Sequence, residues 1–230
     1  MKSKNFYLNY WDQNIHKWSG HYTKITKKNE EIFIKNIFLK VIYDLFIYNL
    51  EKKATLKRLK IAKAFLSVNK SKKKILNDIG AGTGYVTKNF LNKYRKVNFI
   101  DFSSEAINYL KIIKKNSKVY KIDITKQRLI HSDISICLGV TPYIETKYQR
   151  KVLKNILHHS DKILIHYLDR DSIFNKIRII FNFLNVRKVN FFEIKFLDKF
   201  YKVNKILLEE RIYFGTGFCD ILNKKNQKII

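Results

Sequence analysis

Cysteine, proline, glycine and acidic residues are all scarce in this chain. Its 230 residues include two cysteines, one proline and seven glycines. Cys137 and Cys219 lie far apart, and neither has a Cys or His neighbour at the spacing of metal ligands. This pattern excludes a disulfide framework and a zinc knuckle. We therefore expect a protein of a reducing compartment that holds no metal.

Long uninterrupted apolar runs are missing as well. The most apolar long window, residues 32–50, is broken by Lys35, Lys40 and Asp44. A membrane-spanning helix needs about 20 mostly apolar residues. The basic first residues are not followed by the apolar run and small-residue cleavage site of a secretory signal. We expect a cytoplasmic protein without a transmembrane helix.

Positive charge is present in large excess. The chain has 47 Lys and Arg against 19 Asp and Glu, a formal charge of +28. Such a field attracts nucleic acid and anionic membrane surfaces. The abundance of Lys, Asn, Ile, Tyr and Phe is equally what an AT-rich coding sequence would produce, so the charge has two open explanations. The lysines are spread along the whole sequence, which favours the compositional explanation over a nucleic-acid interface.

The pattern of apolar residues changes near residue 72. Residues 30–66 have the apolar spacing of two amphipathic helices, and we expect residues 1–71 to form a helical extension or lid that includes Trp18, His21 and Tyr22. Beyond it, apolar runs alternate with helical patterns. Strands are expected at 73–79, 96–101, 118–123, 133–139 and 162–168, and helices at 85–94 and 103–115. This alternation predicts one α/β domain over residues 72–230, with a mostly parallel sheet covered on both faces.

Three of the seven glycines lie in one short stretch, NDIGAGTGYV, at residues 77–86. Gly80, Gly82 and Gly84 fall where the first strand ends and the first helix begins, which is the ligand-binding turn of doubly wound folds. Residues without a Cβ allow a ligand to approach the backbone closely. The dinucleotide fingerprint G-x-G-x-x-G would need a third glycine at position 85, which is a tyrosine in this chain. A dinucleotide is therefore not the expected ligand.

An acidic residue followed by G-x-G-x-G at the end of the first strand resembles the class I S-adenosylmethionine-dependent methyltransferases. The resemblance implies a Rossmann-like seven-stranded sheet and S-adenosylmethionine as the cofactor. In that family the loop wraps the methionine half of the cofactor, and here it comprises Asp78, Gly80, Ala81, Gly82 and Gly84.

Acidic residues at the ends of the next two strands extend this resemblance. The family places a carboxylate after the second strand to accept hydrogen bonds from the ribose hydroxyls, and Asp101 occupies that place, with Phe102 expected against the adenine. A further acidic residue after the third strand commonly binds the adenine amine. Asp123 matches that position, and Ile124 follows it.

The stretch DISICLGVTPYIE, residues 133–145, narrows the resemblance. It is similar to the fourth strand and following loop of the ubiquinone-biosynthesis and magnesium-protoporphyrin O-methyltransferase type, whose G-V-x-x-Y-I stretch lines the cofactor. Gly139 and Tyr143 fit that pattern, and residues 211–225 resemble the closing hairpin of the group.

Methyl transfer needs the acceptor held in line with the methyl group, and a base where the nucleophile is a hydroxyl. His166 and Asp169, near the end of the fifth predicted strand, are the candidate bases, and Tyr143 is a candidate orienting residue. His166 has a second interpretation as a core histidine paired with the backbone.

Three functions remain open at this stage. The first is a methyltransferase for a small or lipophilic molecule, acting at oxygen. The second is an RNA methyltransferase acting on ribosomal or transfer RNA; VTPY at 140–143 differs from the [DN]-P-P-[YF] motif of adenine amino-methylating enzymes. The third is a non-catalytic binding module. The basic amphipathic stretch at 172–197 is interpreted as a lid or packing element, with contact to an anionic membrane as the alternative.

Overall fold

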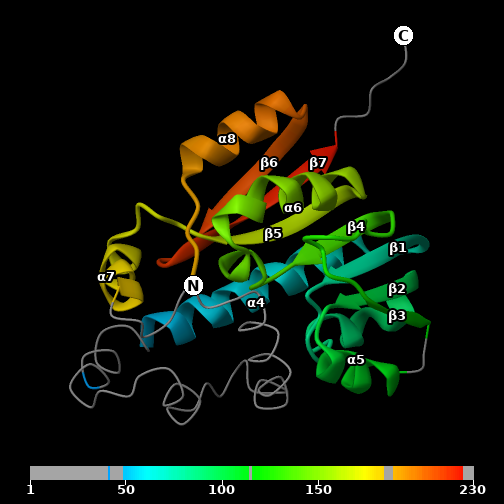
Figure 1. Ribbon diagram of the computed structural model, residues 1–230. Helices are drawn as coiled ribbons and strands as arrows, with labels where there is room; N and C mark the ends of the chain where they lie inside the picture. The colour runs from blue at the N-terminus through cyan, green and yellow to red at the C-terminus, as the bar shows by residue number, and fades with distance from the viewer. Residues whose placement is uncertain (1–40, 42–48, 114–115, 184–188, 225–230) are drawn as a thin grey trace.

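The computed structural model of the chain describes residues 41, 49–113, 116–183 and 189–224. A seven-stranded sheet forms its centre, in the order β3-β2-β1-β4-β5-β7-β6 (Figure 1). Within it, β7 runs antiparallel to its two neighbours, while the pairs among the first five strands are parallel. The strands are β1 Ser71–Ile79, β2 Tyr94–Asp101, β3 Ser117–Lys121, β4 Ser132–Cys137, β5 Ser160–Leu168, β6 Ile206–Tyr213 and β7 Gly217–Lys224.

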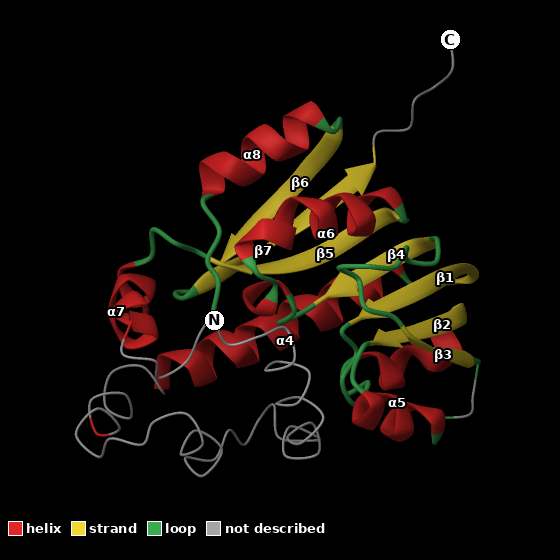
Figure 2. Ribbon diagram, in the orientation of Figure 1, coloured by secondary structure: helices red, strands yellow, loops and turns green. Residues whose placement is uncertain are grey.

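Helices cover both faces of the sheet (Figure 2). The helices are α4 Asn49–Asn69, α5 Ser104–Lys111, α6 Thr146–His158, α7 Ile173–Phe183 and α8 Ile194–Val203, with 3-10 turns η2 at Thr87–Lys93 and η3 at Thr141–Tyr143. Apolar side chains of α4 and α5 share one buried cluster with the sheet, and those of α6 and α8 share the other. The predicted α/β architecture is confirmed.

The apolar strands are explained by these two layers. In β4, Ile134 and Ile136 pack toward α4, whereas Cys137 belongs to the cluster under α6. Successive residues of a strand point to opposite faces, so a strand buried on both sides must be apolar at nearly every position. The five strands expected from the sequence are all present, each with bounds that differ by a few residues.

The helix expected over residues 85–94 is wrong. Residues 87–93 form the 3-10 turn η2, and Tyr94 is already the first residue of β2. The Tyr94 side chain is fully buried, and its hydroxyl donates to the Leu66 carbonyl at 3.0 Å. Tyr94 thus belongs to the buried sheet rather than to the helical stretch.

The helix expected over residues 103–115 is shorter, since α5 ends at Lys111. Its N-cap is Ser103, whose hydroxyl accepts from the Ala106 amide at 3.2 Å. The closing hairpin is confirmed as β6 and β7.

The N-terminal extension lies largely outside the described residues, including Trp18, His21 and Tyr22. Its last part is α4, whose buried face carries Leu59, Ala62, Phe65 and Leu66, as the apolar spacing predicts. Across the described residues, no helix is long and apolar enough to span a membrane.

The stretch 172–197 forms α7 and the start of α8 rather than one continuous helix. Among the α7 side chains that the structure describes, Asn175 is fully buried, and its amide donates to the carbonyls of Asp169 and Thr216 at 2.5 and 2.6 Å. Ile177 on the same helix is 38% exposed. The start of α7 is therefore fixed by a polar anchor beside the end of β5.

We predict that Gly84→Ala destabilises the protein far more than Gly215→Ala. Both glycines have positive φ, 65° and 73°, but a Cβ on Gly84 would lie 2.9 Å from Phe99 while one on Gly215 would meet nothing within 4 Å. Backbone strain alone costs about 1 kcal/mol, and overpacking adds about 1–3 kcal/mol. Urea unfolding of both variants measures the difference, and equal losses would contradict the packing account.

Candidate functional site

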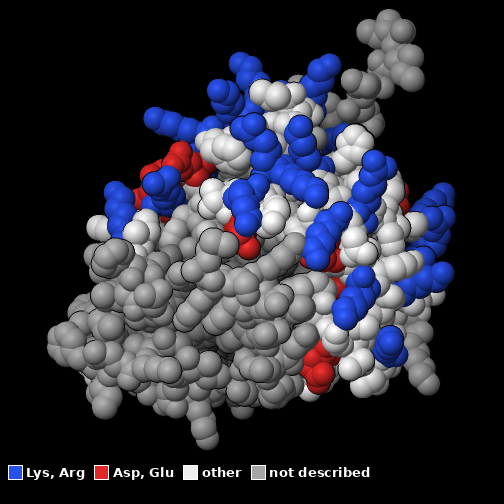
Figure 3. Space-filling view, viewed as in Figure 1, with Lys and Arg blue, Asp and Glu red and all other residues white. Residues whose placement is uncertain are grey.

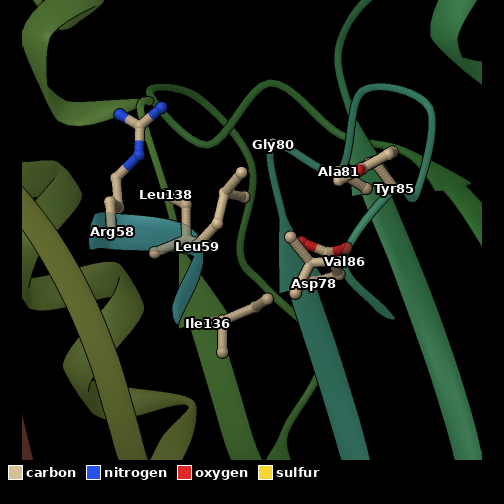
Figure 4. A pocket seen from close by; sticks show the side chains of 9 residues that line it. All are labelled: Arg58, Leu59, Asp78, Gly80, Ala81, Tyr85, Val86, Ile136 and Leu138. Carbon is tan, nitrogen blue, oxygen red and sulfur yellow. The ribbon is translucent and has the colours of Figure 1, made fainter. Parts of the chain in front are cut away.

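A pocket opens at the carboxyl ends of β1 and β4, the edge where open α/β sheets bind ligands. Figure 4 shows side chains from α4, from both strands and from the turn after β1 surrounding it. The lining residues are Arg58, Leu59, Asp78, Gly80, Ala81, Tyr85, Val86, Ile136 and Leu138.

The glycine loop is held open by its backbone conformation. Gly80, Gly82 and Gly84 all have positive φ, at 69°, 56° and 65°. The amides of Gly80 and Ala81 both donate to the Ile100 carbonyl, at 2.8 and 3.1 Å. A Cβ on Gly80 would lie only 2.0 Å from Val140 Cγ2, so this position accepts no other residue without displacing the loop after β4.

Asp101 joins this loop to the end of β2. Its Oδ2 accepts from the Gly82 amide at 2.9 Å, and its Oδ1 accepts from the Ser103 amide at 3.0 Å. The residue is 7% exposed. A carboxylate oxygen can accept more than one hydrogen bond, so a group of this kind is chemically suited to bind a ligand hydroxyl.

Asp78 lies below the loop, at the end of β1. It is buried and accepts a hydrogen bond from the Thr87 hydroxyl. Burial raises the pKa of this carboxyl to about 7; the Thr87 hydrogen bond opposes that effect, and the nearby Asp101 adds to it. Asp78 therefore exchanges its proton near neutral pH, and a cation in the pocket would favour its ionised form.

The residues expected around an adenine lie beyond the pocket lining. Phe102 is half-buried, and Ile124 is buried in the cluster under α6. The Asp123 Oδ1 accepts from the Thr125 amide at 3.0 Å and from its hydroxyl at 2.5 Å, which shapes the turn after β3. Adenine contacts by these three residues stay predictions.

The loop after β4 brings Gly139 to the same edge. Its φ is 72°, and a Cβ there would lie 3.3 Å from Arg58 Nη1. Tyr143 is half-buried at the end of η3. The loop after β4 thus faces both α4 and the glycine loop.

His166 is enclosed rather than open to the pocket. The side chain is 2% exposed, and its ring stacks on Phe214 with centroids 5.5 Å apart. Its Nδ1 lies 3.4 Å from Arg58 Nη1. Burial, and secondarily the Arg58 charge, holds the pKa of His166 well below its usual value. The imidazole is therefore neutral at physiological pH.

Asp169 shapes the turn that follows β5. Its Oδ1 accepts from the Asp171 amide at 3.0 Å, and its backbone carbonyl accepts from the Asn175 amide group. It does not line the pocket. A catalytic role for Asp169 stays a prediction.

Sequence reasoning missed Arg58. It lies on α4 next to the buried Leu59, and its Nε is buried without a hydrogen-bond partner within the described part of the chain. The available signal was an arginine beside the apolar face of an amphipathic helix that is otherwise rich in lysine.

Basic side chains are distributed over several surfaces of the described residues. Figure 3 shows Lys and Arg gathered over α6 and α8. Exposed residues there are Lys147, Arg150, Lys151, Lys154, Lys195, Lys199 and Lys202, and α4 on the opposite face of the sheet exposes Lys52, Lys53, Lys57, Lys60 and Lys63. By contrast, the pocket lining contains one basic residue, Arg58.

The fold is that of the class I methyltransferases. Magnesium protoporphyrin IX methyltransferase from Synechocystis PCC 6803, crystallised with bound S-adenosylhomocysteine, superimposes with a TM-score of 0.71 at 11% identity, covering 96% of this chain and 100% of that one. The small RNA methyltransferase HEN1 gives a TM-score of 0.58 at 17% identity, covering 74% of this chain and 25% of that one.

A third similar structure is the 1,6-didemethyltoxoflavin-N1-methyltransferase of Burkholderia thailandensis, with a TM-score of 0.54 at 12% identity, covering 81% of this chain and 88% of that one. The sequence itself matches no protein-family model and no curated protein. Similarity at this level of identity establishes the fold, and function must be argued from the site.

We predict that Asp78 makes the unfolding free energy pH-dependent. Its pKa is raised from 3.8 to about 7, so the folded state holds the proton more tightly than the unfolded chain. The resulting stability is fully present below pH 3.8 and is lost progressively as the pH rises to about 7. The expected loss between pH 5 and pH 8 is about 2 kcal/mol.

Urea unfolding at several pH values measures this effect. Asp78→Asn removes it, while the exposed Asp171→Asn control keeps it. If wild type and Asp78→Asn lose stability in parallel over this range, the assignment to Asp78 is wrong.

Proposed function

We propose that this protein is an S-adenosylmethionine-dependent methyltransferase that acts on a small or lipophilic molecule at an oxygen atom. The observation that carries the proposal is the Asp101 carboxylate, which accepts the Gly82 amide and thereby holds the glycine loop against the end of β2. A carboxylate beside an open glycine loop, at the carboxyl edge of this sheet, suits a ribose joined to an amino-acid chain.

The described residues fit this cofactor. Asp101 supplies acceptors for two ribose hydroxyls, and Asp78 supplies a buried acid for positive charge. Gly80 provides a backbone surface without a side chain. Phe102, Asp123 and Ile124 are assigned to the adenine side, as the family resemblance implies.

When bound, the cofactor would supply an electrophilic methyl group on a sulfonium. The chain contributes position: the loops after β1 and β4 fix the reacting end, and orientation of this kind is the main source of rate in such displacements. A hydroxyl acceptor held in line with that methyl group would need a base for its proton. Tyr143 and Asp169 are the half-buried candidates near this edge.

Two observations support a small or lipophilic acceptor. The pocket lining is largely apolar, with Leu59, Val86, Ile136 and Leu138 around a single basic residue. The solved structures include enzymes whose names specify a protoporphyrin and a toxoflavin precursor. We place the protein in the cytoplasm, with contact to an anionic membrane as an additional proposal that rests on its +28 charge.

The second candidate is an RNA methyltransferase. It is favoured by the same charge and by the similarity to a small RNA methyltransferase. The exposed lysines and arginine on α4, α6 and α8 lie on both faces of the sheet, and apart from Arg58 on α4 no basic residue lines the pocket. This distribution supports weak nonspecific RNA binding rather than a defined RNA substrate.

We predict that Asp101→Asn weakens the binding of S-adenosylhomocysteine by about 10-fold or more. The substitution keeps the shape of the side chain but removes its charge and one acceptor, and hydrogen bonds to charged groups contribute about 1.5–3 kcal/mol. Isothermal titration calorimetry measures the change, with the exposed Asp171→Asn as the matched control. Unchanged affinity in the Asp101 variant would remove Asp101 from the cofactor site.

The acceptor class is tested by transfer of a labelled methyl group into a cell extract. We expect the label in the small-molecule or lipid fraction, and at a limiting concentration of the labelled cofactor the Asp101 variant should transfer less of it. Label at a defined nucleotide of purified ribosomal or transfer RNA would establish the second candidate instead.

A further inference from the structure

Arg58 presents a charge that the described residues leave uncompensated. Its Nε is buried without a partner, and no ion pair of the described chain includes it. A buried donor with no acceptor costs free energy, more so on a charged group. Such a guanidinium is suited to receive an anion in the pocket that it lines.

Asp78 lies across the same pocket. Figure 4 shows Arg58 on one side and Asp78 on the other, with apolar side chains between them. The two groups form no salt bridge, and Arg58 is not among the causes of the raised Asp78 pKa. A pocket with a separated cation and acid matches a zwitterionic amino-acid group, which carries a carboxylate and an ammonium.

His166 fixes the direction of Arg58. Its Nδ1 faces Arg58 Nη1 at 3.4 Å, and its ring is held by stacking on Phe214. The Nε2 side faces Gly217, where an added Cβ would lie 3.4 Å from that nitrogen. With Nε2 protonated, Nδ1 is an acceptor for the guanidinium. The enclosed ring is therefore better placed to orient Arg58 than to take a proton from an acceptor.

We propose that Arg58, oriented by His166, binds the carboxylate of a zwitterionic amino-acid group whose ammonium faces Asp78. This inference rests on the proposed function, in which that group is the amino-acid end of the cofactor. Arg58 is then a binding residue and His166 a positioning residue. Neither needs to change its protonation state during the reaction.

The test compares two ligands that differ in this group. S-adenosylhomocysteine carries the amino-acid end, whereas 5′-methylthioadenosine keeps the adenosine and the sulfur but lacks it. Calorimetry is performed on the full chain as wild type, Arg58→Gln and Arg170→Gln. Arg170 is an exposed arginine paired with Glu193, so the same substitution there serves as the control.

We expect Arg58→Gln to weaken S-adenosylhomocysteine binding at least 10-fold and to leave 5′-methylthioadenosine within 2-fold, with no change for Arg170→Gln. Equal effects on the two ligands, or no effect on either, would overturn the assignment. If the wild type binds neither ligand, the proposed function fails, and this inference with it. Free L-methionine is a third probe. If Arg58→Gln abolished the binding of L-methionine but left the affinity for S-adenosylhomocysteine unchanged, the amino-acid group would belong to another ligand, and the cofactor assignment would be overturned.

Two variants of His166 test positioning. His166→Asn retains an acceptor near the place of Nδ1 and should bind S-adenosylhomocysteine within about 2-fold of wild type. His166→Leu removes the acceptor and should reproduce the selective loss of S-adenosylhomocysteine seen with Arg58→Gln. Urea unfolding is measured in parallel: a loss of affinity for both ligands that follows stability would show a merely structural histidine.

Discussion

The hydrogen bonds between the glycine loop and the end of β2 are the constraint on which the site depends. The carbonyl of Ile100 accepts two loop amides, and the carboxylate of Asp101 accepts a third from Gly82. The three loop glycines have positive φ, a conformation that glycine adopts without the steric cost of a Cβ. These hydrogen bonds also bring Asp78 and Asp101 close enough for each charge to oppose the other.

The order of the strands places everything else around this loop. Because β1 pairs with both β2 and β4, the loops that follow these three strands meet at one edge. The side chain of Val140 fills the space above Gly80, and Gly139 lies against Arg58. The antiparallel β7 closes the far side, where Phe214 and Gly217 flank His166. Each wall of the pocket therefore comes from a different part of the sequence.

The strands and their ends were predictable from the sequence because burial on both faces makes each strand a short apolar run. Acidic residues at the end of such runs, as at Asp78 and Asp101, stand out against that background. The glycine stretch was visible for the same reason, in a chain with seven glycines. These local signals were enough to predict the α/β fold and to pick out the glycine loop, Asp78 and Asp101 as candidate site residues.

The remaining features depend on contacts that are distant in sequence. Arg58 and His166 are 108 positions apart, and neither has a local pattern that indicates the other. The helix expected at 85–94 was wrong, and its last residue, Tyr94, lies in β2 and donates to the distant Leu66 carbonyl, a contact that no local pattern indicates. Similarly, α7 is anchored by Asn175, a polar residue that an apolar pattern does not identify.

The exposed basic residues that make up most of the net charge differ in their surroundings from Arg58 at the pocket. Exposed lysines on α4, α6 and α8 remain hydrated, so adding or removing one changes the long-range field but little else. Arg58 differs because its Nε is buried and its neighbour His166 is kept neutral by burial and by the Arg58 charge itself. A protonated His166 would repel the guanidinium and lose its acceptor. Of the 47 Lys and Arg residues, Arg58 is the one that lines the described pocket, so an anion in that pocket would meet its guanidinium rather than the hydrated surface charges.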